Sequence, residues 1–225
     1  QKFTILFDLD GTLVDTAPDL MLAHNHVMKK FGYPTKSTED IRNLVGKGAG
    51  ALIGRSIWGQ AKKEFSKVLD EKIKDDMVKE FINFYGKNII NKSTLINGVK
   101  EFLKWCKEQN ISMAVCTNKQ ERLSNDLLKK IGIYDFFEYV AGSDTFDYCK
   151  PDPRHLTNVV EILDGDIKRT IMIGDSENDA NAAKAAEIPV ILLENGYTEK
   201  NTTEIYHNHL IKDFIGIEKI ITKYL

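Results

Sequence analysis

Two aspartates that follow a predicted first strand are the residues of this chain best suited to chemistry. Residues 3–7 are apolar or β-branched, and Asp8 and Asp10 come directly after them, before Gly11. A short apolar run that ends at a glycine predicts a buried strand, and side chains two residues apart in extended backbone point to the same side. We therefore expect both carboxylates at the carboxyl end of a strand, where open α/β sheets bind ligands. Two anions this close need a cation, and Mg²⁺ prefers oxygen ligands. The alternative is a strand that simply ends in solvated acids.

Polar residues also follow a second predicted strand and a proline turn. Thr117 and Asn118 come after the apolar run 111–116, and Lys150 precedes the turn 151–153. A hydroxyl, an amide and the N–H groups of a helix N-terminus suit phosphate oxygens, although Thr and Asn also cap helices. A lysine on the rigid turn can neutralise a phosphate and a neighbouring nucleophile, although an isolated lysine of this kind is usually a surface residue.

A third strand end adds two more carboxylates. The apolar segment 170–173 leads into Gly174, and Asp175 and Asp179 lie four residues apart at the start of a predicted helix. Asp175 is a candidate metal ligand, and Asp179 can orient that ligand or the metal-bound waters. Acids in the first turn of a helix also serve as local caps. Local roles explain each motif alone, but not why successive strand ends all supply groups for one site.

The remaining pattern divides the chain into a helical segment and an alternating one. From residue 98 onward strands and helices alternate, which is typical of a parallel sheet with helices on both faces. Between 17 and about 90 the spacing of apolar residues is helical and no strand is expected. We interpret residues 1–16 and 90–225 as an α/β core and residues 17–89 as an inserted helical domain. Expected helices are 17–31, a short one from Thr38, 51–58, 63–86, 98–109, 119–131, 153–163 and 176–186, and expected strands after the first are 111–116, 139–141, 170–173 and 190–193.

Composition excludes several classes of protein. The net charge of −2 gives no reason to expect nucleic acid or an acidic membrane as a partner, and no apolar run approaches the length of a membrane span. The three cysteines are widely spaced and odd in number, which favours reduced thiols in a cytoplasmic protein. The oligomeric state stays open between a monomer and a weak dimer.

Four motifs in combination resemble one enzyme family over almost the whole chain. Asp8-x-Asp10-Gly-Thr, Thr117-Asn118, Lys150-Pro and Gly174-Asp-x-x-x-Asp179 are similar to the motifs of the haloacid dehalogenase-like superfamily of phosphohydrolases. Within it, segments 7–20, 45–49 with Arg55, 150–153 and 174–180 resemble phosphoglycolate phosphatases. The resemblance implies an α/β fold with a Rossmann-like parallel sheet and a small helical cap of the C1 type inserted after the first strand. It also implies a small phosphorylated metabolite as substrate, foremost 2-phosphoglycolate.

The resemblance assigns a role to each strand-end residue. Asp8 is expected to attack phosphorus and form an aspartyl-phosphate, while Asp10 protonates the leaving oxygen and then deprotonates the hydrolytic water. Mg²⁺ is expected on Asp8, the backbone carbonyl of Asp10 and Asp175, with Asp179 supporting that site. The phosphoryl oxygens are assigned to Thr117, Asn118 and Lys150.

Substrate choice is expected to reside in the cap. Gly46, Lys47 and Gly48 precede a predicted helix, so their N–H groups and the Lys47 ammonium are candidates for a second anion such as a carboxylate. A glycine-rich turn also serves as a plain linker. Arg55 is the other candidate cation, although on a helix it can equally form a structural ion pair.

Other activities fit parts of the same pattern. A pyrophosphatase, a nucleotidase or a sugar-phosphate mutase would use the same core with a different cap. A dehalogenase is disfavoured because halide departure does not need the acid and base that Asp10 provides. Receiver domains of signalling proteins also use a phosphorylated Asp with Mg²⁺, but they are about half this length and lack a helical insertion.

Overall fold

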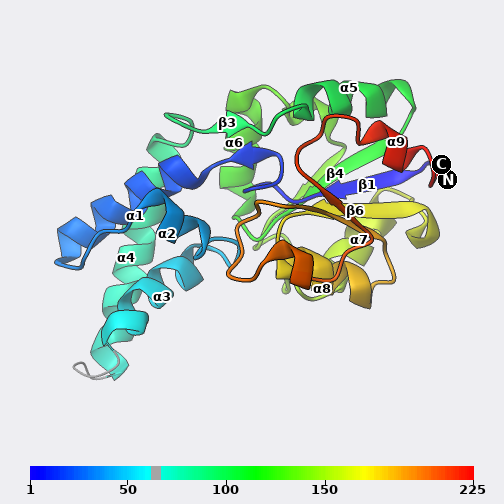
Figure 1. Cartoon of the computed structure of the whole chain (residues 1–225). Helices are drawn as coiled ribbons and strands as arrows, with labels where there is room; N and C mark the ends of the chain where they lie inside the picture. The colour runs from blue at the N-terminus through cyan, green and yellow to red at the C-terminus, as the bar shows by residue number, and fades with distance from the viewer. Residues whose placement is uncertain (62–66) are drawn as a thin grey trace.

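A six-stranded parallel sheet forms the centre of the fold (Figure 1). The computed structural model describes residues 1–61 and 67–225. Strand β1 (Thr4–Phe7) is fully buried and pairs in parallel with β4 (Ser112–Cys116) and β6 (Thr170–Gly174), in the order β5-β4-β1-β6-β7-β8. Because every strand is parallel, all carboxyl ends lie at one edge of the sheet. The other strands are β5 (Tyr139–Ala141), β7 (Val190–Leu193) and β8 (His209–Ile211).

Helices cover both faces of this sheet, as the alternating pattern predicts. Consecutive residues of β1 point to opposite faces, so Ile5 and Phe7 belong to one apolar cluster and Leu6 to another. In Figure 1, α5 and α6 lie on one side of the sheet and α7 and α8 on the other. The helices are α5 (Val99–Glu108), α6 (Glu121–Ile131), α7 (Arg154–Ile162), α8 (Glu177–Ala185) and the short α9 (Glu218–Ile221).

Four further helices form the insertion that the sequence predicts after the first strand. They stand beside the carboxyl edge of the sheet in Figure 1, and α4 packs against both α1 and α3. We call this group the cap; the boundaries at 16/17 and 89/90 stay a prediction. The α/β fold with a helical cap is confirmed. The cap helices are α1 (Ala17–Phe31), α2 (Thr38–Arg42), α3 (Ala49–Ala61) and α4 (Lys67–Lys87).

A two-stranded connection joins the cap to the core. Strand β2 (Val14–Asp15) pairs antiparallel with β3 (Thr94–Leu95), so the entry and exit of the cap lie side by side. The buried carboxylate of Asp19 in α1 also accepts hydrogen bonds from the backbone N–H groups of Lys92 and Ser93 and from the Ser93 hydroxyl. These bonds fix the start of the cap against its end.

Several short elements differ from the sequence prediction. The two-stranded connection, β8 and α9 are too short to show a periodic pattern. Helix α3 begins at Ala49 rather than at residue 51, whereas α2 begins at Thr38 as predicted and is capped by the Ser37 hydroxyl. The predicted helix 63–86 corresponds to α4, but its residues 63–66 lie outside the described part of the chain. Three 3₁₀ turns were also not predicted: Tyr134–Phe136, Ile167–Arg169 and Thr202–Glu204.

Candidate active site

Asp8 lies at the carboxyl end of β1, where a lysine from a distant loop meets it. Its Oδ1 accepts a hydrogen bond from the Leu9 N–H (2.7 Å) and lies 3.0 Å from the Lys150 Nζ. Lys150 is 3% exposed, and its backbone N–H donates to the ring of buried His155. Burial lowers the pKa of Lys150, but the Asp179 and Asp8 carboxylates outweigh that effect and raise it above its usual range. The lysine therefore stays charged beside the carboxylate.

Asp175 ends β6 on the neighbouring strand, where loop residues hold its carboxylate. Its Oδ1 accepts from the Thr12 hydroxyl (3.0 Å), and its Oδ2 accepts from the Tyr197 backbone N–H (2.6 Å). Gly11 has a φ of +79°, and a Cβ there would collide with Asp175 Oδ2 and the Tyr197 ring. The glycine of the first motif is thus needed for its left-handed conformation and for close approach to Asp175.

Asp179 serves both as a helix cap and as the partner of Lys150. Its Oδ2 accepts from the backbone N–H groups of Asp175 and Ser176 and from the Ser176 hydroxyl, while its Oδ1 lies 2.6 Å from Lys150 Nζ. The capping role that the sequence left open is therefore present, and the predicted support of a metal site by Asp179 stays a prediction.

The three carboxylates form a buried acidic cluster that fits a divalent cation. Asp8, Asp175 and Asp179 each place one carboxylate oxygen within 4.8 Å of the others. Burial, followed by the charge of Asp179, raises the pKa of Asp8, and burial with the charge of Asp8 raises that of Asp175. Asp179 accepts three hydrogen bonds on Oδ2 and one from Lys150 on Oδ1, and the assignment of a metal to Asp8 and Asp175 stays a prediction. Hard oxygen ligands of this kind suit Mg²⁺ among other cations.

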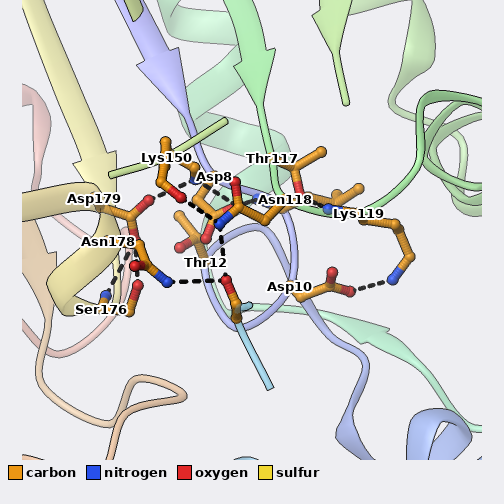
Figure 2. A network of polar contacts seen from close by, with 12 residues as sticks. Asp8, Asp10, Thr12, Thr117, Asn118, Lys119, Lys150, Ser176, Asn178 and Asp179 are labelled. Atoms are coloured by element: carbon orange, nitrogen blue, oxygen red, sulfur yellow. Dashed lines mark hydrogen bonds and ion pairs between the residues drawn. The ribbon is translucent and has the colours of Figure 1, made fainter. Parts of the chain in front are cut away.

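Asp10 turns its side chain away from this cluster. In Figure 2 the Asp10–Lys119 pair lies on one side of Asp8, and Lys150 with Asp179 lies on the other. Asp10 Oδ1 accepts from the Lys119 Nζ (2.6 Å) and the Thr16 hydroxyl (2.7 Å). Lys119 is only 9% exposed and its Nζ lies 4.6 Å from the centroid of the Tyr85 ring. The contribution of Asp10 to a metal, predicted through its backbone carbonyl, stays a prediction.

Thr117 and Asn118 follow β4 and face the same edge. The Thr117 hydroxyl accepts from the Lys119 N–H (3.1 Å). The Asn118 side-chain N–H₂ donates to the carbonyls of Lys150 (2.8 Å) and Gly46 (3.1 Å). Asn118 thus ties the core to the cap, and its phosphate-binding role stays a prediction. Its Oδ1 is buried and lacks a hydrogen-bond partner among the described residues.

A cavity of about 210 Å³ lies between these strand ends and the cap. Its core end is polar except for Leu123, and its cap wall is apolar except for the hydroxyl of Tyr85. At the core end it is lined by Asp8, Asp10, Thr117, Asn118, Lys119, Gln120, Leu123 and Ser143, and the larger cap side chains that line it are Leu20, Val45, Leu52, Val78, Phe81, Ile82 and Tyr85.

The four predicted cap residues divide into two groups. Gly46 and Gly48 line the cavity, and the Gly46 carbonyl is held by the side-chain amides of Asn118 and Asn178. Lys47 is exposed and, with Arg55, lines a neighbouring hollow beside α8 instead. Arg55 forms an ion pair with Glu199 of the core, which is the structural role left open for it. A specificity role for Lys47 and Arg55 stays a prediction.

Comparison with known proteins assigns the family. A model of the haloacid dehalogenase-like hydrolases matches residues 5–193. This chain belongs to that family. It is 38% identical to a phosphoglycolate phosphatase of Mesorhizobium japonicum, over 93% of this chain and 90% of that protein. It is 39% identical to a phosphoglycolate phosphatase of Caulobacter vibrioides, over 96% of this chain and 89% of that protein. A crystal structure of a predicted phosphoglycolate phosphatase from Haemophilus somnus superposes with a TM-score of 0.90 at 31% identity and covers 97% of each chain.

The family match confirms the predicted resemblance and that the chain is an enzyme of the hydrolase class. No helix in the described parts of the chain has the length and apolar character needed to span a membrane.

The structure of this haloacid dehalogenase-like hydrolase also adds residues that the sequence analysis missed. Lys119 directly follows Thr117-Asn118 at the end of β4, so the strand-end argument could have included it. Thr12 is the last residue of the first motif and Thr16 follows it closely, but nothing in the sequence shows which carboxylate each would meet. Tyr197, which comes from the loop after β7, has no recognisable sequence signal.

Proposed function

We propose that this enzyme is a Mg²⁺-dependent phosphomonoesterase that hydrolyses 2-phosphoglycolate through an aspartyl-phosphate. The observation that carries the proposal is the position of Asp8 on the cavity wall, 3.0 Å from Lys150 and within a cluster of three buried carboxylates. The relatives that share most of its length and are named phosphoglycolate phosphatases support the substrate.

Asp8 is the group we assign to nucleophilic attack. Both of its described contacts fall on Oδ1, so Oδ2 is the oxygen that attacks phosphorus as the bond to the ester oxygen breaks. Asp10, held on the cavity wall, gives its proton to the leaving oxygen. It then takes a proton from the water that attacks phosphorus and releases Asp8. The covalent intermediate divides one difficult displacement into two easier ones.

Charge compensation is the second requirement, because a dianionic phosphate must approach an acidic cluster. Lys150 stays charged beside Asp8, and Thr117 offers its hydroxyl proton to a phosphoryl oxygen. Mg²⁺ on Asp8 and Asp175 supplies further positive charge at the phosphoryl group.

The shape and polarity of the cavity support a small substrate. On the cap side of the wall, among the described residues, the hydroxyl of Tyr85 is the one polar side-chain group. A hexose would leave several hydroxyls without partners there, which is costly when they are removed from water. This disfavours the sugar-phosphate mutase alternative. We also propose a cytoplasmic location, which fits the three free thiols of Cys106, Cys116 and Cys149.

Phosphate release tests the proposal directly. We would measure kcat/KM for 2-phosphoglycolate, glucose 6-phosphate, AMP and pyrophosphate, with Mg²⁺ and with EDTA. We expect turnover only with the metal, and a kcat/KM for 2-phosphoglycolate at least tenfold above the others. Turnover in EDTA would contradict the metal assignment, and a preference for a sugar phosphate or nucleotide would contradict the substrate.

A further inference from the structure

The positive charge on the wall of the cavity comes from the core. Among the described residues that line the cavity, only Lys119 carries a cation. The two cap cations that the sequence singled out, Lys47 and Arg55, line the neighbouring hollow, and Arg55 is paired with Glu199. A second anionic group of a bound substrate would therefore meet Lys119 first.

Tyr85 of the cap stands next to this lysine with an unused hydroxyl. Its side chain is 1% exposed and lines the cavity, its ring centroid lies 4.6 Å from Lys119 Nζ, and its hydroxyl has no partner among the described residues. A buried hydroxyl without a partner is costly, so an orphaned one on a cavity wall indicates a ligand that completes it. Tyr85 and Lys119 thus meet on the cavity wall, with the ammonium over the ring and the hydroxyl without a partner among the described residues.

We propose that Lys119 and Tyr85 bind the second anionic group of the substrate, which for 2-phosphoglycolate is its carboxylate. The inference rests on the proposed function, because Asp10 is the group that we assign to the leaving oxygen. Lys119 Nζ lies 2.6 Å from Asp10 Oδ1, so a carboxylate close to the leaving oxygen reaches this ammonium. The apolar cap wall strengthens the attraction by keeping water away.

The same geometry links recognition to chemistry. The carboxylate of the substrate competes with Asp10 for the Lys119 ammonium. Asp10 then keeps the Thr16 hydroxyl, 2.7 Å away, as its remaining donor and is released to turn toward the leaving oxygen. Lys119 Nζ is already held at 2.6 Å from Asp10 Oδ1, so the ammonium is in position when substrate arrives.

The test compares two esters with one skeleton, 2-phosphoglycolate and 2-hydroxyethyl phosphate, in which a hydroxymethyl group replaces the carboxylate. We would measure kcat/KM of the Mg²⁺-loaded enzyme for both. We expect wild type to prefer 2-phosphoglycolate. Lys119→Met should reduce that preference tenfold to a hundredfold, the range of about 1.5–3 kcal/mol typical of a hydrogen bond to a charged group. Lys119→Arg should restore part of it, and Tyr85→Phe, which keeps the ring and its packing, should reduce it a few-fold.

Three outcomes would overturn the inference. Equal losses on both esters in Lys119→Met would show that the lysine only positions Asp10. Loss of the preference in Lys47→Met but not in Lys119→Met would place the carboxylate at the cap loop. A wild type that hydrolyses both esters equally would remove the second-anion site while leaving the phosphatase intact, whereas one that hydrolyses neither would overturn the proposed function itself. Lys87→Met, an exposed lysine at the end of α4, is the control for loss of charge alone.

Discussion

The two ends of the cavity are built in opposite ways. Asp8 and Asp10 line the core end, and Asp175 and Asp179 lie beside Asp8. Among the described residues, the cations within ion-pair distance of this set are the ammonium groups of Lys119 and Lys150. Four acidic and two basic side chains are thus buried together, so the acidic groups are in excess. At the cap end, apolar side chains of α1, α3 and α4 form the wall, and none of these lining side chains carries a charge.

This difference separates reactivity from stability. The core end concentrates like charge, which disfavours the ionised carboxylates and is unfavourable to the folded state until a cation binds. The cap wall contributes to folding through burial of apolar surface and carries little chemistry. Substitutions that remove a carboxylate at the core end should therefore lower activity strongly and can raise the stability of the metal-free protein. Substitutions in the cap wall should lower stability and change the range of substrates.

The largest effect should come from Asp8→Asn. We expect phosphate release to fall at least about a thousandfold, because the amide cannot act as the nucleophile. In EDTA the same variant should have a Tm a few degrees higher than wild type, because it removes one charge from the acidic cluster. Lys150 would still have an ion-pair partner in Asp179, whose Oδ1 lies 2.6 Å from its Nζ. Phosphate-release kinetics and thermal unfolding in EDTA measure both quantities.

A control with the same chemical change at an exposed site makes this prediction specific. Asp76→Asn lies on the solvent side of α4 and should leave both activity and Tm close to those of wild type. A lower Tm for Asp8→Asn than for Asp76→Asn would contradict the view that the charge of Asp8 is unfavourable in the metal-free fold.

The residues of the core end could be predicted from the sequence because parallel strands place their carboxyl ends at one edge of the sheet. Asp8, Thr117 and Asp175 each follow an apolar strand, and parallel strands bring their carboxyl ends to one edge whatever the loops do. The order of strands did not have to be known for that argument. The division into sheet and helical insertion followed from the same periodicity.

The cap wall could not be predicted in this way. Which face of α4 meets the core depends on the packing of helices against one another, so nothing local marks Tyr85 as a cavity residue. Tyr197 reaches Asp175 from the loop after β7, and no sequence pattern marks that contact. Strand β8 is only three residues long, which is too short for a periodic pattern. Lys47 has a suggestive sequence context, yet its side chain is exposed beside a different hollow.

A titration should separate two buried groups of the core by their response to acid. His155 is fully buried against Lys150, and burial, with the nearby Lys150 charge, lowers its pKa to about 4. The folded state therefore disfavours the protonated ring. The stability this group contributes is complete above its unfolded pKa of about 6.5 and is lost as pH falls toward 4, by about 3 kcal/mol. Asp8 acts in the opposite sense, since its raised pKa makes the folded state take up a proton more readily.

His155→Asn isolates the histidine, because the aspartates remain in both proteins. The amide oxygen can still accept the hydrogen bond of the Lys150 N–H. Urea unfolding in EDTA at pH 7.5 and 4.5 should show wild type losing about 2–3 kcal/mol more than the variant on acidification. His207→Asn, a half-buried ring before β8, is the control and should follow wild type. Parallel pH curves for wild type and His155→Asn would rule out this histidine as the source of acid sensitivity.

The smallest effect should come from the cap wall itself. Val78 is partly buried on α4 and lines the cavity, so Val78→Ala enlarges it by about two methyl groups without touching a charged residue. We expect a loss of stability of about 1 kcal/mol, smaller than for a fully buried site because Val78 is only partly packed. Activity on 2-phosphoglycolate should change less than threefold, while kcat/KM for a bulkier ester such as phenyl phosphate should rise a few-fold.

Val140→Ala is the control, because Val140 is a partly buried valine of β5 that does not line the cavity and undergoes the same side-chain change. A rise for phenyl phosphate in both variants would trace the gain to a general loosening of the fold, and a thousandfold loss in Val78→Ala would mean that the wall takes part in the chemistry after all.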